Sequence, residues 1–486
     1  MATAIPENQA RFGLDQVAAL TGGQLLPGTS GADVVVGVTL DSRRLSPGRL
    51  FVALTGDRHD AHAFLGAAEA AGAFVLVRKG HPALSEHPSL RGVAVDDTLF
   101  ALGELARAHR AAWPGRVVGI TGSMGKTTTK RLMAAGLAGV GTRVWATPGN
   151  LNNRVGVPMT LLVLDERYDH AVIEMGTSEP GEIARLAAIA QPDVGVVTHV
   201  AIAHTAGLGT LDDVAVEKGA LFAALAPHQV AVGCGDDEHV ARQLDRSPAL
   251  RKVRYGLGPG NLWRAQVVSL DASGTRIALE RAPDERDPGA QLELRLRMIG
   301  DAAAENIAAV AAVLEALGFV AHHSFHALAA VEPEPGRLVP RPLAGERLVL
   351  DDTYNANPAS TAMAIKTAAR IASEGGRPLV VVLGDMRELG RSSLGEHRAV
   401  GSMLAGLKAR LLITTGPEMR AAARAARERG VQVHETGSSE AAALAALALV
   451  RARDVVLVKG SRSMAMERVV AALTGHADRA TDGAHP

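Results

Sequence analysis

The feature that most constrains the fold of this chain is a glycine-rich turn between an apolar strand and the start of a helix. Residues 117–120 read VVGI, a short buried-strand pattern, and residues 121–129 read TGSMGKTTT. Backbone N–H groups at such a turn can face inward around a phosphate, and the helix N-terminus adds partial positive charge. The nucleotide-binding residues expected here are Gly122, Ser123, Met124, Gly125, Lys126, Thr127 and Thr128.

Within this phosphate loop, Lys126 is expected to reach the terminal phosphates of a nucleotide, and the hydroxyl of Thr127 is expected to bind Mg²⁺. The strict pattern is not met, because Ile120 stands where the first glycine would be. The alternative is an ordinary glycine-rich turn between a strand and a helix. A Gly-Lys-Thr-Thr-Thr run directly after a strand favours nucleotide binding over that alternative.

Strand and helix patterns alternate along most of the chain, which predicts an α/β fold with mostly parallel sheets. The 486 residues suffice for roughly three domains. We expect an N-terminal domain at residues 1–113, a central nucleotide-binding domain at 114–334 and a C-terminal Rossmann-like domain at 335–486. Within the central domain, strand patterns with little helix between them at residues 253–298 predict a small antiparallel extension.

Charge and cysteine content narrow the classes of function. Basic and acidic residues both number 51, and a chain without net charge is a poor candidate for nucleic-acid binding. Cys234 is the one cysteine, which excludes an intrachain disulfide and fits a cytoplasmic location. The most apolar segment, residues 441–450, is shorter than a membrane helix, and no signal peptide is evident. We therefore expect a cytoplasmic protein without membrane insertion, and we separately expect it to be a monomer.

Three polar residues after the loop are candidates for a metal site. Glu174 closes an apolar strand, and a carboxylate at the carboxyl end of a buried strand can hold Mg²⁺, although such a glutamate can also simply face water. His204 lies just past the next strand, and the residues alone leave open whether it is a ligand. His199 competes with it but is expected to be buried within the strand. On its own pattern, Lys218 is a solvent-facing lysine on a helix that begins near residue 211.

Taken together, these segments resemble the Mur ligase family over nearly the whole chain. The runs that carry the resemblance are DSR at 41–43, PGRLFVAL at 47–54, TPGNLNN at 147–153, IEMG at 173–176, DDTYNANP at 351–358, LGDM at 383–386 and KGSRSM at 459–464. The resemblance implies a UDP-sugar-binding N-terminal domain, a central ATPase domain and a Rossmann-like C-terminal domain. It also implies an ATP-dependent amide ligase that joins D-alanyl-D-alanine to UDP-N-acetylmuramoyl-tripeptide through an acyl phosphate.

The resemblance further implies two Mg²⁺ ions and a modified lysine. Lys218 matches the lysine that the family carbamylates with CO₂, which would turn it into a metal-binding anion. It would hold the second ion together with His204, while Thr127 and Glu174 hold the first. Arg337 matches an arginine near the ATP phosphates. The catalytic residues implied in this way are Lys126, His204, Lys218 and Arg337.

The remaining matches concern binding. Asn306 matches an asparagine on the adenine side of the nucleotide, and Asp352 matches a carboxylate that contacts the ribose. The residues expected to contact the other substrates are Ser42, Arg43, Asn150, Asn152, Asn153, Asn355 and Asn357.

The chain departs from the family pattern in two places near the site. Ala302 and Ala303 stand where the family has His and Asn, which affects the adenine contacts, and His199 replaces the family's asparagine before the metal-binding histidine. No departure removes a proposed catalytic group. The alternatives are another Mur-type amide ligase, or a catalytically silent nucleotide-binding regulator of wall synthesis, which would have lost the metal-binding and phosphate-stabilising residues.

Overall fold

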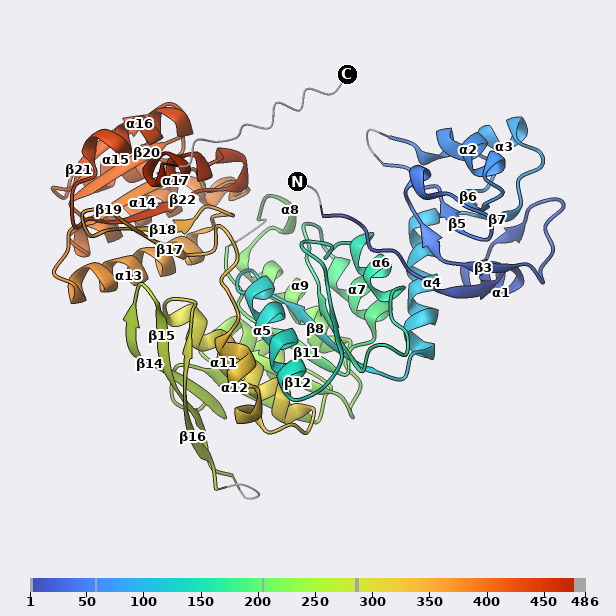
Figure 1. Cartoon of the computed structure of the whole chain (residues 1–486), viewed down its shortest axis with the longest axis horizontal. Helices are drawn as coiled ribbons and strands as arrows, with labels where there is room; N and C mark the ends of the chain where they lie inside the picture. The colour runs from blue at the N-terminus through green and yellow to red at the C-terminus, as the bar shows by residue number, and fades with distance from the viewer. Residues whose placement is uncertain (1–2, 57–58, 203–204, 285–287, 476–486) are drawn as a thin grey trace.

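The computed structural model describes residues 3–56, 59–202, 205–284 and 288–475. Its three larger sheets each take their strands from one stretch of the chain and lie in a bent row, with the N-terminal and C-terminal sheets at opposite ends (Figure 1). This arrangement agrees with the predicted α/β class, while the expected domain boundaries at residues 113 and 334 stay predictions. Among the residues that the structure describes, none of the helices combines the length and apolar character that a bilayer crossing demands.

The N-terminal sheet has five strands in the order β2-β7-β6-β5-β4, parallel except at β2. The strands are β2 (Gln24–Leu25), β4 (Val38–Thr39), β5 (Leu50–Val52), β6 (Phe74–Arg78) and β7 (Gly92–Val95), beside a separate ribbon of β1 (Arg11–Gly13) and β3 (Val34–Val36). The helices are α1 (Leu14–Thr21), α2 (Leu65–Ala70), α3 (Ala83–Glu86) and α4 (Thr98–Ala112). Nearly all side chains of the three inner strands are buried, as expected for parallel strands covered on both faces.

The central sheet has nine strands in the order β16-β15-β14-β13-β12-β11-β8-β10-β9. They are β8 (Arg116–Thr121), β9 (Val144–Ala146), β10 (His170–Glu174), β11 (Val194–Val197), β12 (Val230–Cys234), β13 (Arg251–Gly256), β14 (Trp263–Asp271), β15 (Gly274–Arg281) and β16 (Ala290–Leu296). Pairing is parallel from β9 to β14 and antiparallel among β14, β15 and β16. The predicted parallel sheet with an antiparallel extension is therefore confirmed.

Eight helices accompany the described part of this sheet. They are α5 (Lys126–Gly139), α6 (Gly156–Leu161), α7 (Glu182–Ala190), α8 (Thr205–Leu208), α9 (Leu211–Ala223), α10 (Glu238–Asp245), α11 (Asp301–Ala316) and α12 (Phe325–Ala329). The helix that follows the phosphate loop, α5, packs against α11, so the start of α11 lies close to the loop.

The C-terminal sheet has six strands in the order β17-β18-β22-β19-β20-β21. They are β17 (Val339–Leu343), β18 (Arg347–Asp352), β19 (Leu379–Gly384), β20 (Leu411–Thr415), β21 (Gln432–Thr436) and β22 (Val455–Lys459), with α13 (Pro358–Glu374), α14 (Ser393–Gly406), α15 (Arg420–Arg427), α16 (Ser439–Leu449) and α17 (Glu467–Thr474). Only β17 pairs antiparallel, and its prolines at 340 and 342 lack N–H donors, which suits an edge strand. The remaining pairing is parallel, as predicted for a Rossmann-like sheet.

One strand is shorter than the sequence pattern indicates. The apolar run at residues 194–200 forms strand only over Val194–Val197. Its neighbour β8 pairs with it as far as Thr121, where the chain turns into the phosphate loop. The prediction that His199 is buried within the strand is therefore wrong, because this residue lies beyond the strand, beside the loop.

Candidate active site

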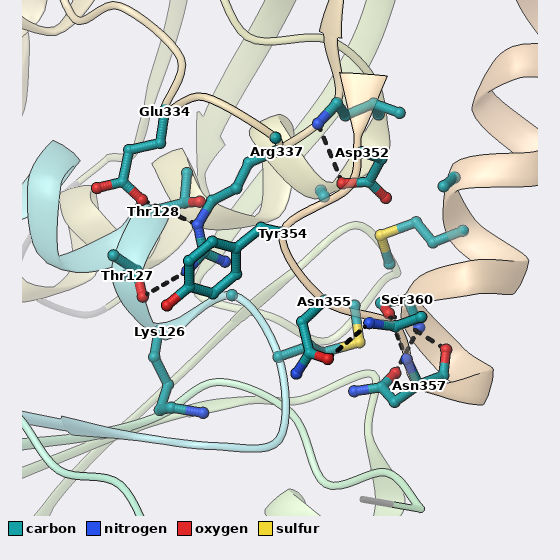
Figure 2. A pocket seen from close by; sticks show the side chains of 18 of the residues that line it. Lys126, Thr127, Thr128, Glu334, Arg337, Asp352, Tyr354, Asn355, Asn357 and Ser360 are labelled. Atoms are coloured by element: carbon teal, nitrogen blue, oxygen red, sulfur yellow. Dashed lines mark hydrogen bonds and ion pairs between the residues drawn. The ribbon is translucent and has the colours of Figure 1, made fainter. Parts of the chain in front are cut away.

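A cavity of about 670 Å³ lies between the central and C-terminal sheets. The phosphate loop and α11 line one side, and the segment before β17 with the ends of β18 and β22 lines the other (Figure 2). The predicted site residues that it brings together are Ser123, Met124, Gly125, Lys126, Thr127, Thr128, Asn150, Asn152, Glu174, Asn306, Arg337, Asp352, Asn355 and Asn357. Parallel strands place ligands at their carboxyl ends, which is where this cavity opens.

The phosphate loop has backbone geometry that only glycine adopts readily. Gly122 and Gly125 have φ of 146° and 81°, and a Cβ atom on Gly122 would collide with the hydroxyl of Thr198. Lys126 is the first residue of α5, and its Nζ donates to the carbonyl of Gly122 at 2.6 Å. Burial lowers the pKa of Lys126, against the attraction of nearby Glu174. The loop thus holds a poorly solvated ammonium group at a helix start, where an anionic ligand would neutralise it.

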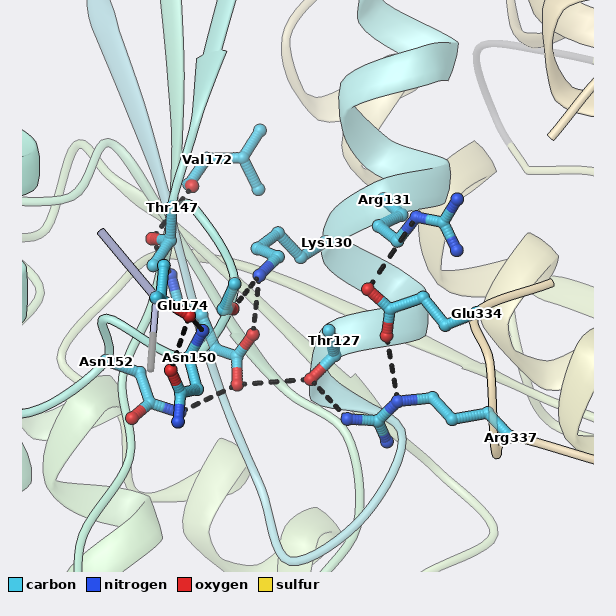
Figure 3. Close-up of polar contacts among 12 residues, drawn as sticks. Thr127, Lys130, Arg131, Thr147, Asn150, Asn152, Val172, Glu174, Glu334 and Arg337 are labelled. Carbon is cyan, nitrogen blue, oxygen red and sulfur yellow. Dashed lines mark hydrogen bonds and ion pairs between the residues drawn. The ribbon is translucent and has the colours of Figure 1, made fainter. Parts of the chain in front are cut away.

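Glu174 ends β10 and lies at the centre of a polar network beside the loop (Figure 3). It is 2% exposed, which excludes the alternative of a strand-end glutamate facing water. Its Oε1 accepts from Thr127 Oγ1 at 3.3 Å and from Asn152 Nδ2 at 2.8 Å, and Lys130 Nζ lies 3.0 Å from Oε2. Burial favours the neutral acid, but the nearby lysines and the amide outweigh it, so the pKa of Glu174 lies below its ordinary value.

Lys130 is a residue of this network that sequence reasoning missed. It is buried in α5, and besides Glu174 it contacts the carbonyl of Gly149 at 2.8 Å. This lysine therefore connects the strand-end carboxylate to the segment that holds Asn150 and Asn152. The sequence could have predicted this position, because Lys130 lies four residues after Lys126 and therefore on the same face of the helix.

Arg337 reaches the loop from the segment between α12 and β17. Its Nη2 donates to Thr127 Oγ1 at 3.1 Å, and its Nε donates to Glu334 at 2.9 Å. The guanidinium carbon lies 4.2 Å from the centre of the Tyr354 ring. Three groups, Thr127, Glu334 and Tyr354, thus fix Arg337 beside the phosphate loop, as Figure 2 shows.

The opposite wall is built around Asp352 at the end of β18. Lys459 Nζ donates to its Oδ2 at 2.6 Å, and the backbone N–H of Leu338 donates to its Oδ1 at 3.0 Å. Lys459 also donates to the carbonyl of Asn355 at 2.8 Å. Asn357 caps α13, because its side chain accepts from the backbone of Ser360. Lys459 was not among the predicted site residues, although it begins the KGSRSM run.

Lys218 differs from its own local pattern. It is 2% exposed on α9, so the expectation of a solvent-facing lysine is wrong. Burial, with a smaller contribution from the charge of Lys126, lowers its pKa to about 7. His204, its predicted partner at the second metal ion, lies outside the described residues.

Three predicted substrate residues lie away from the main cavity. Ser42 and Arg43 line a second cavity of about 550 Å³ between the N-terminal part of the chain and Met159 of α6, together with Arg44 and Arg49. The Arg43 side chain is 87% exposed and pairs with Asp41 at 2.8 Å. Asn153 lies just before α6, and its Oδ1 accepts from the backbone N–H groups of residues 155 and 156.

Comparisons with known proteins agree with this architecture. The family model for the Mur ligase middle domain matches residues 120–314, and the model for the Mur ligase glutamate ligase domain matches residues 336–462. The UDP-N-acetylmuramoyl-tripeptide–D-alanyl-D-alanine ligase of Escherichia coli (strain K12) is 37% identical over 95% of this chain and 98% of its own. The ligase of the same name from Bacillus subtilis (strain 168) is 31% identical over 90% of this chain and 93% of its own.

Solved structures give the same result. A crystal structure of MurF from Acinetobacter baumannii has a TM-score of 0.82 at 28% identity and covers 96% of this chain and 100% of its own. The MurF ligase from Thermotoga maritima in complex with ADP has a TM-score of 0.78 at 28% identity, over 90% of this chain and 97% of its own. The relatives match nearly the whole chain, and the family models match the two sheets that enclose the cavity. The chain therefore belongs to the Mur ligase family, as a member of its MurF branch.

Proposed function

We propose that this protein is a cytoplasmic, ADP-forming ligase that uses ATP to join D-alanyl-D-alanine to UDP-N-acetylmuramoyl-tripeptide in peptidoglycan precursor synthesis. The observation that carries the proposal is one cavity that holds a phosphate loop, a buried carboxylate and an arginine at the same threonine hydroxyl. The relatives named above support the choice of substrates. A silent nucleotide-binding regulator is disfavoured, because the groups that phosphoryl transfer needs are assembled around one cavity.

The chemistry explains the need for these groups. A carboxylate is a poor electrophile, and transfer of the γ-phosphoryl group of ATP makes it an acyl phosphate with a competent leaving group. The protein's part is positioning and charge stabilisation. Loop N–H groups would hold the phosphates, while Lys126 and Arg337 would balance the charge on the migrating phosphoryl group. The amine of D-alanyl-D-alanine would then displace phosphate and form the amide.

Thr127 and Glu174 fit a magnesium site. The hydroxyl and carboxylate oxygens lie 3.3 Å apart, and oxygen is the ligand type that this hard cation prefers. A bound Mg²⁺ would supply neutralisation of phosphate charge. Lys130 and Asn152 contribute by fixing the carboxylate from the other side, which keeps it ionised and oriented.

We also propose that Lys218 is carbamylated and contributes to a second magnesium site with His204. Carbamylation needs a neutral amine to attack CO₂, and a pKa of about 7 makes that form abundant at neutral pH. Burial then protects the carbamate from water. Incubation with ¹³C-labelled bicarbonate should give a carbamate signal that is lost in Lys218→Ala, and short carboxylic acids should partly restore that variant's activity. A wild-type spectrum without the signal would refute the modification.

The function is tested by the mass of the product formed from ATP, Mg²⁺, the UDP-linked tripeptide and D-alanyl-D-alanine. We expect the linked pentapeptide, with phosphate released only when both substrates are present. If the tripeptide carboxylate carries heavy oxygen, the acyl phosphate route places one label in the released phosphate. Nucleotide hydrolysis without a joined product would exclude the ligase.

A further inference from the structure

One wall of the main cavity is apolar, with a single acidic side chain set into it. Met298, Ile299, Ala302 and Ala303 contribute the apolar surface at the start of α11, next to the phosphate loop. Glu305 belongs to the same helix and also lines the cavity, although the residue is only 8% exposed. An apolar wall beside a phosphate loop suits the base of a nucleotide, and a buried carboxylate within it requires a partner.

His199 is one such partner. Its Nε2 lies 2.9 Å from Glu305 Oε2, and its Nδ1 lies 3.4 Å from Asp237 Oδ2. Burial opposes the charged form, but hydrogen bonds to Asp237, Cys234 and Glu305 outweigh it and raise the pKa of His199 well above its ordinary value. Each ring nitrogen of His199 thus faces a carboxylate oxygen, and the contact with Glu305 is the shorter of the two. The arrangement is therefore an ion pair that holds Glu305 in place.

Asn306, next to Glu305, provides the complementary group. Its Oδ1 accepts from Thr129 Oγ1 at 3.0 Å, which engages the amide oxygen and makes Nδ2 the group it can offer a ligand. A Cβ atom on Gly125 would lie 3.3 Å from this amide, so the side chain lies directly against the phosphate loop. Adjacent residues thus present an acceptor and a donor to the same cavity.

The acceptor of Glu305 and the donor of Asn306 match adenine better than guanine. At its N6/N7 edge, adenine presents the amino donor beside the N7 acceptor, whereas guanine presents the O6 carbonyl beside N7 and has no donor on that edge. A carboxylate accepts from the amino group and repels the carbonyl oxygen. The chain has Ala302 and Ala303 where the family has His and Asn, so the usual polar side chains are absent from this part of the wall.

We propose that Glu305 selects adenine over guanine nucleotides by accepting from the exocyclic amino group, and that His199 is a positioning residue that holds its carboxylate. This inference rests on the proposed use of ATP and adds the residues that read the base. With Ala302 and Ala303 in place of the His and Asn of the family pattern, Glu305 and Asn306 are the polar side chains that this stretch of α11 presents to the cavity.

The test measures the dissociation constants of ADP and GDP by calorimetry with the full-length protein and Mg²⁺. The wild type should prefer ADP, and Glu305→Gln should reduce that preference at least about tenfold, because the amide can donate to the guanine oxygen. Glu315→Gln is the matched control: it removes a charge from the same helix, where Glu315 pairs with Arg281, and should leave the preference unchanged. His199→Ala should lower the preference, whereas His199→Gln, which can still donate to Glu305, should retain it.

An unchanged ADP-to-GDP ratio in folded Glu305→Gln would overturn the inference. If that variant does not fold, the wild type decides the matter alone: inosine diphosphate, which has a carbonyl in place of the amino group, should bind at least about tenfold more weakly than ADP, and equal binding would overturn the inference. Failure of the proposed function is a separate outcome, because it appears as absence of joined product while the nucleotide preference is still measurable.

Discussion

Replacing Lys126 with alanine tests the role of the phosphate loop. The ammonium group lies half-buried at the start of α5, 2.6 Å from the carbonyl of Gly122. A phosphate oxygen bound in the loop would lie roughly 4 Å from this charge, and an effective dielectric constant of about 20 gives an attraction of about 4 kcal/mol. If this attraction is realised in the transition state, its loss lowers kcat about a thousandfold.

The assay is the rate of phosphate release at saturating ATP and both co-substrates. Lys366→Ala is the control, because Lys366 is exposed on α13 and its removal should leave kcat unchanged. The melting temperatures of both variants should be compared with that of the wild type, so that a lower rate is not mistaken for unfolding. Turnover of Lys126→Ala within a few-fold of the wild type would refute the assignment of the loop.

Three further predictions concern the charged groups around the loop. Lys130→Met leaves the Glu174 carboxylate without its nearest ammonium partner, which costs about 3–5 kcal/mol for a buried pair. We expect a lower melting temperature that partly recovers when Glu174→Gln is added, and additive losses in the double variant would contradict the pairing. Arg337→Lys keeps the charge but cannot bridge Thr127 and Glu334, so kcat should fall at least about tenfold in the phosphate-release assay, and an unchanged rate would contradict the bridging role. The carbamate signal of Lys218 should grow as pH rises through about 7, because the neutral amine reacts, and a signal that falls over that range would be inconsistent with the proposal.

The phosphate loop and Glu174 could be located from the sequence because their signals are local. A strand followed by glycines and a lysine fixes the loop, and a charge that closes an apolar strand marks the edge of the sheet where ligands bind. The same reasoning placed His199 in the strand, since apolarity alone does not show where a strand ends. Its end at Val197 is set by the neighbouring strand β8, which stops pairing at Thr121.

The local sequence pattern gave the wrong environment for Lys218, which it predicted to face solvent. Lys218 has Val214 and Ala215 one turn before it and Leu221 and Phe222 one turn after it, all buried with it on one face of α9. That spacing was visible in the sequence, but an isolated lysine is most often solvated. Its burial depends on neighbouring elements that pack against that face, which a single helical pattern does not reveal.

The position of Arg337 has a consequence for how the enzyme completes a cycle. This side chain belongs to the stretch that leads into the six-stranded sheet, yet it donates to a hydroxyl on the phosphate loop of the nine-stranded sheet. A change in the negative charge of a ligand at the loop therefore also changes the free energy of the contact between the nine-stranded and six-stranded parts of the molecule. By thermodynamic reciprocity, separation of these two parts lowers the affinity for the bound ADP by the same free energy.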